Sequence, residues 1–347
     1  MSAPVILAID GNSLVHRSYH AQARTGLHDA TGRPAWAVRG LLMQLVAAVD
    51  RIRPNAVIVG FDDPDESARR ERWPDYKANR IDKLESLVDQ LLCAVEVLRE
   101  LGVAVQVPRS LEADDVLAST VTHAKALGAA TVVVTSDRDA FALIDETTTV
   151  LRIINGGVEA SPMMTAERLV LLLGVRPEQY RDFAALRGDP ADNLPGVRGI
   201  GPRSAARLLQ EFGTAAAAFD DLDGVRSRLG PGVAARLADP AARPAWELNC
   251  KVMAMHADVP IELDLATGPG VLPLAADAVD AVFRAQRLLW TVNEALCVLA
   301  DADPDRLEQP REHLPSWFDP APSGGWQRPR FPKLPARPAT AQLSLFD

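Results

Sequence analysis

Three short apolar runs, each ending at or just before an aspartate, constrain the fold of this chain more than any other feature. They are Val5–Ile9, Ala56–Phe61 and Thr131–Thr135, and each has the length and the branched apolar content of a buried strand. Segments with helical periodicity, Leu84–Leu101 and Val116–Leu127, lie between the second run and the third. This alternation of strand and helix predicts an α/β fold with a mostly parallel sheet flanked by helices.

Two further segments extend the predicted sheet. Val103–Val107 predicts another strand, and Val150–Ile154 followed by Asn155-Gly156-Gly157 predicts a strand that enters a hairpin turn. Together with the three main runs, these segments predict one sheet-based domain over residues 1–180.

Beyond Pro177 the strand signals fade, and helical stretches rich in Ala, Leu and Arg are broken by Gly and Pro clusters. This pattern predicts a helical second domain over residues 181–300. Prolines then recur throughout residues 301–347, with basic residues between them. Such a segment cannot bury enough apolar surface to offset its ordering entropy, so we expect a mostly extended, mobile tail.

Composition limits the classes of protein to consider. With 347 residues, of which 48% are hydrophobic, the chain can bury a sizeable core. No basic stretch precedes the first apolar run, and Asp10 cuts that run short, so we expect no secretory signal, no membrane anchor and a cytoplasmic location. Cys93, Cys250 and Cys297 lie far apart, which predicts reduced thiols and argues against disulfides and structural zinc.

Nine acidic residues come from segments that the predicted fold brings to one place. Aspartates follow each main strand, further acids open the helix after residue 111, and a pair follows Gly188. The carboxyl ends of parallel strands lie along one edge of a sheet, which is where ligand sites form. The nine acids are Asp10, Asp62, Glu112, Asp114, Asp115, Asp137, Asp139, Asp189 and Asp192.

Clustered carboxylates need compensation, because like charges raise one another's pKa. Divalent cations can supply it, and the formal net charge of −9 then ceases to argue against a nucleic-acid partner. Oxygen-only ligands favour Mg²⁺ or Mn²⁺ over zinc, and two such ions promote hydrolysis of a phosphodiester. Taken singly, each aspartate could instead be a turn former or a helix cap. Capping gives no reason, however, for all of them to gather at one sheet edge.

Five segments in order and spacing carry a family resemblance. They are Asp10-Gly11-Asn12 with Arg17-Ser18-Tyr19-His20-Ala21, Tyr76-Lys77-Ala78-Asn79-Arg80, Glu112-Ala113-Asp114-Asp115-Val116, Thr135-Ser136-Asp137-Arg138-Asp139, and Gly188-Asp189 through Asp192-Asn193-Leu194-Pro195-Gly196. Through them the chain resembles the bacterial 5′-3′ exonucleases and flap endonucleases, including the amino-terminal domain of DNA polymerase I. The resemblance covers about residues 5–265 and implies a PIN-like fold.

The resemblance implies roles for the residues that match. The nine acids would hold two or three Mg²⁺ or Mn²⁺ ions, Lys77 and Arg80 would meet the scissile phosphate, and Arg17 would contact DNA. Tyr76 would stack on an unpaired base. A basic arch would span about residues 64–84, although the same run could be a solvated helix face. It contains Arg69, Arg70, Arg72, Lys77, Arg80 and Lys83.

Two residues depart from the family pattern. Ala191 stands where serine is usual between the paired aspartates, which puts one hydroxyl contact near the metal or turn in doubt. His16 stands where tyrosine is common, which leaves a stacking role there in doubt. Neither change removes a charge that the chemistry needs.

A second DNA contact is predicted at about residues 184–212. Gly196–Pro202, followed by a helical segment, has the form of a helix-hairpin-helix, which this family extends to a helix-three-turn-helix. Gly199 and Gly201 would let the backbone approach a phosphate, and the helix amino terminus would present free N–H groups to it. Arg198 and Arg203 would add phosphate contacts. The resemblance also suggests K⁺ at this motif.

The carboxyl-terminal residues predict a protein partner. Gln342, Leu343, Leu345 and Phe346 resemble the Q-L-x-L-F peptide with which bacterial replication and repair proteins bind the sliding clamp. Leu345 and Phe346 would fill an apolar pocket while the tail acts as a tether. The alternative is that the peptide docks onto this protein's own core.

These features favour a metal-dependent 5′ nuclease that cuts DNA at flaps and free 5′ ends in replication and repair. Whether RNA primers in RNA-DNA hybrids are also substrates is left open by the sequence. Two other classes remain open. A PIN-type ribonuclease shares a carboxylate-lined α/β core but lacks the arch and the helix-hairpin-helix. A non-catalytic, clamp-associated DNA-binding protein would have little need of a complete acid cluster.

Overall fold

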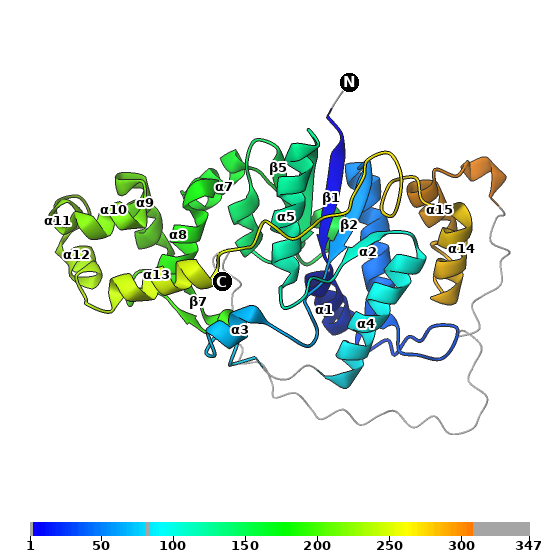
Figure 1. The fold of residues 1–347 in the computed structure, drawn as a ribbon, viewed down its shortest axis with the longest axis horizontal. Coiled ribbons are helices and arrows are strands. Elements are labelled where there is room, and N and C mark those ends of the chain that lie inside the picture. The colour runs from blue at the N-terminus through cyan, green and yellow to red at the C-terminus, as the bar shows by residue number, and fades with distance from the viewer. Residues whose placement is uncertain (1–2, 81–83, 308–347) are drawn as a thin grey trace. The chain divides into compact units, whose positions relative to one another are not determined.

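A six-stranded sheet in the order β3-β2-β1-β4-β5-β6 forms the centre of the computed structural model, which describes residues 3–80 and 84–307 (Figure 1). Strands β1 to β5 run parallel to their neighbours, and β6 is antiparallel to β5. Each predicted strand agrees with an observed strand to within two residues. The strands are β1 Val5–Asp10, β2 Ala56–Gly60, β3 Ala104–Gln106, β4 Ala130–Thr135, β5 Thr148–Arg152 and β6 Met163–Met164.

The sheet is buried on both faces, as the continuous apolar runs predicted. Ile6 and Ala8 of β1 face one core, which is shared with helices α5, α7 and α8. Leu7 and Ile9 face the other core, which is shared with α1, α2 and α4. The helices named so far are α1 Gly11–Gln22, α2 Trp36–Ile52, α4 Glu85–Glu100, α5 Ala113–Ala126, α7 Ala166–Leu173 and α8 Pro177–Arg187.

The chain beyond α8 is helical, as predicted, apart from the two-residue strands β7 and β8, which pair with each other. Tyr180 of α8 packs edge-on against Phe141, with ring centroids 5.4 Å apart, so the helical part continues one of the two cores of the sheet. The remaining elements are α3 Ala68–Arg72, α6 Gly157–Ala160, β7 Gly188–Asp189, β8 Leu194–Pro195, α9 Pro202–Phe212, α10 Ala215–Asp220, α11 Leu222–Leu229, α12 Pro231–Leu237, α13 Ala242–Val252, α14 Ala276–Ala285 and α15 Val292–Ala300, with short 3₁₀ helices at Asp139–Leu143, Pro190–Asp192 and Pro304–Arg306.

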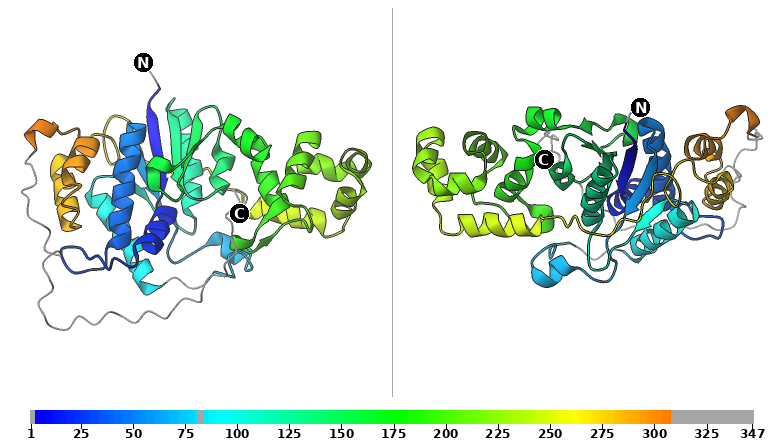
Figure 2. Two further views of the ribbon diagram at one scale, coloured as in Figure 1. Left: turned by 180° about the vertical axis from the view of Figure 1, so that it is seen from behind. Right: turned by 45° about the horizontal axis from the view of Figure 1, so that its top comes forward.

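The segment after α13 returns to the sheet (Figure 2). The Val57 amide donates to the Gly270 carbonyl at 2.8 Å, and the Gly270 amide donates to the Gly102 carbonyl at 2.7 Å. Helices α14 and α15 then join the core formed by α2 and α4. These two helices, which were predicted to belong to the helical domain of residues 181–300, therefore pack against the sheet-based part of the chain.

The turn predicted at Asn155-Gly156-Gly157 is present, with an antiparallel bridge between Ile154 and Gly157, but the returning strand does not follow it directly. Gly156, with φ of 106°, precedes the one-turn helix α6, and the antiparallel partner β6 begins only after it. Cys93 is buried, Cys250 and Cys297 are half-buried, and all three are free in the structure. None of the helices in the described part of the chain has the length and apolar character needed to cross a bilayer.

The peptide at residues 342–347 and Lys83 of the predicted arch lie outside the described residues.

The short β7-β8 pair requires glycine at position 196, because the backbone of Arg187 and Gly188 lies very close to it. A Cβ placed on Gly196 would lie 2.2 Å from the Arg187 carbonyl oxygen and 2.6 Å from the Gly188 amide nitrogen. Both neighbours are backbone atoms, which cannot yield as a flexible side chain can. The pair holds the turn that carries Asp189 and Asp192.

We therefore predict that Gly196→Ala lowers the free energy of unfolding by about 2 kcal/mol or more, because the added methyl group overpacks a backbone contact. Urea unfolding followed by circular dichroism measures this. Gly201→Ala is the matched control, because a Cβ there meets nothing within 4 Å. Its cost should stay within about 1 kcal/mol, that of a weakened helix cap. Equal losses in the two variants would contradict the prediction.

Candidate metal centre and nucleic-acid interface

A pocket of about 610 Å³ opens at the carboxyl ends of the central strands. Its lining combines acids with basic and polar side chains from α1 and from the segment after α3. The structure thus brings five of the nine predicted metal ligands to one pocket. They are Asp10, Asp62, Glu112, Asp114 and Asp137.

The fold positions these acids through ordinary backbone features. Asp10 ends β1 and caps α1, where its carboxylate accepts from the Ser13 amide at 2.9 Å and from the Thr135 hydroxyl at 2.7 Å. Asp62 follows β2 and accepts from the Asn12 side-chain amide at 2.7 Å and from the Ala113 amide at 3.0 Å. The helix-cap interpretation is therefore correct for Asp10, and a cap at a strand end also directs a carboxylate to the sheet edge.

A second acidic group adjoins the first. Asp139 lies near Asp137, Asp189 and Asp192, and burial together with these three charges raises the pKa of Asp139 to about 8. The buried Oδ1 atom of Asp139 has no hydrogen-bond partner among the described residues. Asp189 caps the 3₁₀ turn by accepting from the Ala191 amide at 2.9 Å. The turn after Gly188 therefore brings its two aspartates to the acids that follow β4.

Two acids that line the pocket also have raised pKa values. Burial raises the pKa of Asp10 to about 7, with further contributions from Asp62 and Asp137, although two hydrogen bonds oppose the shift. Burial and the neighbouring charges of Asp137 and Asp10 raise the pKa of Asp114 well above its ordinary value. The protein's own cations therefore leave part of the negative charge uncompensated.

Within the described ranges, no three of these side chains converge closely enough to hold one ion as they stand. Some of these carboxylates bond to protein donors instead, as Asp10 does to Ser13 and Thr135. The donor set nevertheless fits a hard divalent cation, because it consists of carboxylate oxygens and includes the unpartnered Oδ1 of Asp139. Asp10, Asp62, Glu112, Asp114 and Asp137, with Asp139, Asp189 and Asp192 beside them, are the residues that would hold it.

Two basic residues from the segment after α3 face the acids. The Lys77 ammonium lies 2.8 Å from Glu112 Oε1, and the Arg80 guanidinium pairs with Asp192. Burial lowers the pKa of Lys77, but Glu112 and Asp192 outweigh that effect and shift it upward, so the ammonium stays charged. Lys77 has φ of 57°, in the left-handed region, and its amide donates to the Asp192 carbonyl at 2.9 Å. A strained backbone is thus held by the same turn that carries the paired aspartates.

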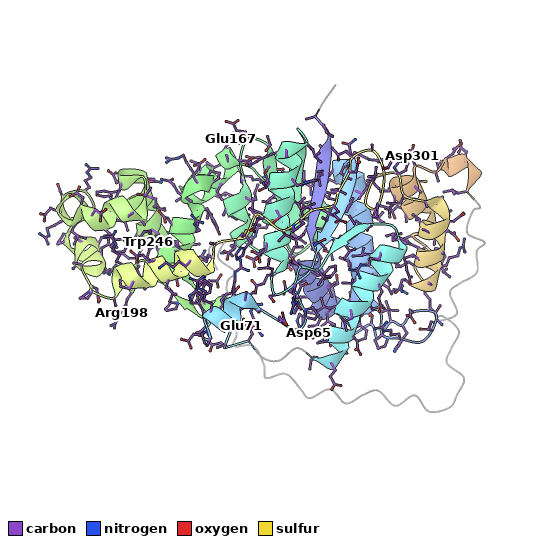
Figure 3. All side chains as sticks on the ribbon, in the orientation of Figure 1. Asp65, Glu71, Glu167, Arg198, Trp246 and Asp301 are labelled. Atoms are coloured by element: carbon purple, nitrogen blue, oxygen red, sulfur yellow. The ribbon has the colours of Figure 1, made fainter. Side chains whose placement is uncertain are left out.

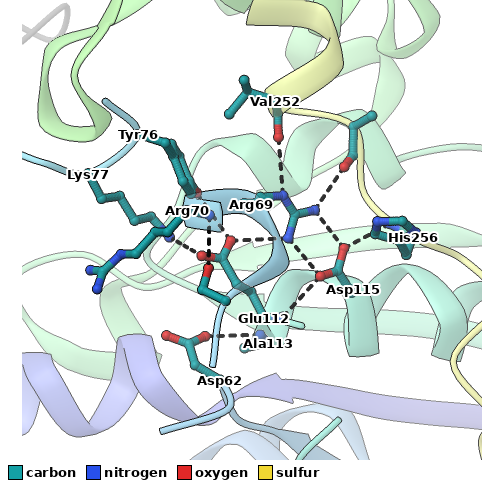
Figure 4. Close-up of polar contacts among 12 residues, drawn as sticks. Asp62, Arg69, Arg70, Tyr76, Lys77, Glu112, Ala113, Asp115, Val252 and His256 are labelled. Atoms are coloured by element: carbon teal, nitrogen blue, oxygen red, sulfur yellow. Dashed lines mark hydrogen bonds and ion pairs between the residues drawn. The ribbon is translucent and has the colours of Figure 1, made fainter. Parts of the chain in front are cut away.

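Tyr76 lies in the protein interior beside Glu112. Its side chain is buried, its ring packs with Leu194 and Val252, and its hydroxyl donates to Glu112 Oε2 at 3.1 Å (Figure 4). Tyr76 also lines a second pocket, of about 530 Å³, and its stacking on a base stays a prediction. Arg17 lines the main pocket, where its guanidinium donates to the Asn155 side chain at 3.0 Å.

Asp115 lies outside the pocket. Its carboxylate is fully buried and faces Arg69, with two contacts of 2.7 Å (Figure 4). Burial raises the pKa of Asp115, but the hydrogen bonds and charge of Arg69 outweigh that effect and lower it below its ordinary value. The spacing from Glu112 to Asp115 matches a capping box, in which Asp115 accepts the Glu112 amide at 3.0 Å. That spacing is a signal in the sequence that could have separated Asp115 from the other acids.

The predicted helix-three-turn-helix has the expected form. Helix α8 leads through the β7-β8 turn and an exposed loop to α9, which begins at Pro202 with Gly201 as its cap. Gly199 has φ of 78°, in the left-handed region that favours glycine. Arg198, Gly199, Gly201 and Arg203 are exposed, and Figure 3 shows Arg198 pointing outward from the helical part. The loop therefore presents backbone and cationic groups to a ligand.

Residue patterns alone missed three contributors to the pocket. Asn12 brackets Asp62, donating to its side chain and accepting its amide at 3.0 Å. Ser13 and Ser136 join the ends of β1 and β4 through a contact of 2.5 Å between their hydroxyls. Asn12 and Ser136 belong to the recognised motifs, but their types allow too many roles for a sequence to assign one.

We predict that the metal-free protein loses thermal stability as the pH rises from about 4 to about 8. Asp10 and Asp139 have folded-state pKa values of about 7 and about 8, above the ordinary value of 3.8. An acid with a raised folded-state pKa stabilises the fold most below its unfolded pKa, and this contribution disappears as the pH passes the folded value. Scanning calorimetry in EDTA measures the trend.

Mg²⁺ should oppose this loss, because the cation replaces the protons that the acids release. Asp10→Asn is the control, since a side chain that cannot ionise should flatten the dependence. A melting temperature in EDTA that stays constant across this range would contradict the prediction.

Comparisons with known proteins agree with this geometry. A model of the 5′-3′ exonuclease N-terminal resolvase-like domain matches residues 5–171. A model of the 5′-3′ exonuclease C-terminal domain, described as a SAM fold, matches residues 175–271. The two matches are adjacent and in order, and together they span the sheet and the helical part up to the returning segment.

Similar proteins show the same relationship. DNA polymerase I of Mycobacterium bovis is 37% identical over 235 residues, which are 68% of this chain and 26% of the polymerase, so the chain spans about a quarter of that relative. A bacteriophage T5 flap endonuclease solved with DNA and metal ions has a TM-score of 0.56 and 18% identity, covering 86% of this chain and 100% of that one. The catalytic core of Rad2 with DNA substrate has a TM-score of 0.53 and 16% identity, covering 86% and 92%.

These structural likenesses establish the fold, and the family models establish the relationship. Both models describe parts of one enzyme family, and together they match most of the chain. The chain therefore belongs to the 5′-3′ exonuclease family, whose members hydrolyse DNA phosphodiester bonds.

Proposed function

We propose that this chain is a 5′ nuclease that uses Mg²⁺ or Mn²⁺ to cut DNA at flaps and free 5′ ends. The observation that carries the proposal is the pocket at the sheet edge, where five carboxylates face Lys77. Residues 1–180 would form the catalytic part and residues 181–300 the helical DNA-binding part, with α14 and α15 as a brace on the former. A DNA substrate would place the protein in the cytoplasm at the nucleoid.

Two or three divalent ions bound by these acids would activate a water molecule and stabilise the leaving oxygen of the phosphodiester. The chain's own cations would act on the substrate. Lys77, charged and directed by Glu112, would offer a positive charge to a phosphate oxygen, and Arg80 would hold the same group from the side of Asp192. Both residues lie on the segment after α3, so the proposed arch would carry the electrophiles.

Duplex DNA would bind at the helix-three-turn-helix. The amino terminus of α9 lacks a side-chain cap, and its first amides lie beside exposed Gly201. Such amides favour a phosphate, and Arg198 and Arg203 would extend the contact along the backbone. K⁺ at the carbonyls of this loop is part of the same proposal.

The first test is cleavage of a labelled 5′ flap. We expect products with Mg²⁺ or Mn²⁺ and none with EDTA. Asp137→Ala should lower the rate by at least about 100-fold, because a lost carboxylate leaves the transition-state charge poorly stabilised. Binding of flap DNA in Ca²⁺ should change little. Glu100→Gln, which removes an exposed acid at the end of α4, is the control and should cut normally.

The same assay separates the alternatives. Faster turnover of single-stranded RNA than of flap DNA would favour a PIN-type ribonuclease. Binding of flap DNA without cleavage in either metal would favour a non-catalytic DNA-binding protein. The exposed, Gly-rich loop before α9 argues for a duplex DNA ligand.

We propose in addition that Gln342, Leu343, Leu345 and Phe346 bind a sliding clamp. Deleting residues 342–347 should weaken clamp binding by roughly 10-fold or more, because two apolar anchors are lost. Surface plasmon resonance on an immobilised clamp measures this. A chain with the six residues in scrambled order keeps composition and length and should bind as weakly as the deletion. If the chain without these residues bound the clamp with unchanged affinity, the proposed clamp contact would be wrong, and docking of the peptide elsewhere would be favoured.

A further inference from the structure

Arg69 is the one residue of the basic run from 69 to 80 whose guanidinium is buried with every donor engaged. Its side chain is 7% exposed, whereas Arg70 and Arg72, on the same helix α3, are exposed. Nε donates to the Val252 carbonyl at 3.1 Å, and one Nη2 bond reaches the Ala254 carbonyl at 2.8 Å. The other three bonds reach carboxylates (Figure 4).

The carboxylate of Asp115, the partner of Arg69, accepts four hydrogen bonds. Asp115 Oδ1 accepts from Arg69 Nη2 at 2.7 Å and from the His256 amide at 2.8 Å. Asp115 Oδ2 accepts from Arg69 Nη1 at 2.7 Å and from the Glu112 amide at 3.0 Å. A carboxylate has about four acceptor positions, so these four bonds leave none directed at a cation. The bidentate geometry is also one that arginine forms and lysine does not.

Three separate segments meet at this ion pair. Arg69 belongs to α3, Asp115 to the first turn of α5, and Val252, Ala254 and His256 to the end of α13 and the segment after it. Arg69 also donates to Glu112 Oε2 at 3.2 Å, the same oxygen that Tyr76 contacts, while Lys77 holds Oε1. Arg69 and Tyr76 thus fix Oε2 of a pocket acid from the buried side, and Lys77 holds Oε1 in the pocket.

We propose that Arg69 and Asp115 form a positioning lock, in which Asp115 holds Arg69 and Arg69 orients Glu112, and that Asp115 does not ligate metal. The inference rests on the proposed function only in its last step, the presentation of Glu112 to a cation. The lock itself is a property of the protein without metal, and it joins the base of the proposed arch to the acid cluster and to the helical part.

The test compares substitutions of two adjacent acids, Asp115 and Asp114, which we expect to change the melting temperature differently. In EDTA, Asp115→Asn should lower the melting temperature by roughly 5 °C or more, because a buried arginine loses its counter-charge. Asp114→Asn, one residue away on α5 but facing the pocket, should leave the melting temperature unchanged or raise it, because it relieves repulsion from Asp137 and Asp10. Calorimetry of the full chain measures both.

The arginine is tested in the same way. Arg69→Gln should lower the melting temperature as Asp115→Asn does. The double variant should be no less stable than the less stable of the two single variants, because neither charge is then left unpaired. Arg69→Lys should rescue little, since an ammonium cannot form the paired contact. Arg70→Gln removes one positive charge from the same helix and should leave the melting temperature unchanged.

Mn²⁺ binding separates a positioning lock from a purely structural one. By isothermal titration with Mn²⁺ alone at 25 °C, well below unfolding, Arg69→Gln and Asp115→Asn should each weaken binding by roughly 10- to 100-fold, with Arg70→Gln unchanged. Unchanged Mn²⁺ affinity in both would overturn the positioning role. The lock would be overturned if Asp115→Asn changed the melting temperature in EDTA as Asp114→Asn does. It would also be overturned if the double variant lost as much stability as the two single variants added together. A wild-type chain that binds no Mn²⁺ would refute the proposed metal site while the EDTA results still decide the lock.

Discussion

The burial of carboxylates at one edge of a parallel sheet, together with their repulsion of one another, sets the electrostatics of this site. Parallel strands end together, so Asp10, Asp62 and Asp137 become neighbours although they are far apart in sequence. The burial of Asp10 is costly for its charged form, and its raised pKa expresses that cost. A fold that tolerates this cost is suited to binding cations, because the same acids that repel one another in the free protein provide a hard, all-oxygen site.

The protein treats its acids in two different ways. Asp115 is fully paired with a buried arginine and with backbone amides, and its pKa is lowered. Asp114, its neighbour in sequence, has no such partner and its pKa is raised. Successive residues on a helix differ in direction by roughly 100°, so one carboxylate turns into the protein and the other into the pocket. Compensated acids support the structure, and uncompensated acids remain available for a ligand.

The motifs in the sequence went far toward predicting the fold. Continuous apolar runs predicted strands buried on both faces, and they form the centre of the sheet. The return of residues 253–307 to the sheet was not foreseen, because the backbone contact of Gly270 with Val57 depends on shape rather than on a residue pattern. The spacing of the basic run does not distinguish the buried Arg69 from the exposed Arg70.

By itself, the sequence determined the class of fold, the oxygen-only character of the acid cluster and the loop before α9, because apolar periodicity, carboxylate chemistry and glycine geometry are local properties. The tertiary structure decided which acids share a pocket, that Tyr76 is buried, and that Asp115 is paired with Arg69. These outcomes depend on which donors lie within about 3 Å of each oxygen. That distance is set by the packing of α3, α5 and the segment after α13, which no single stretch of the chain encodes.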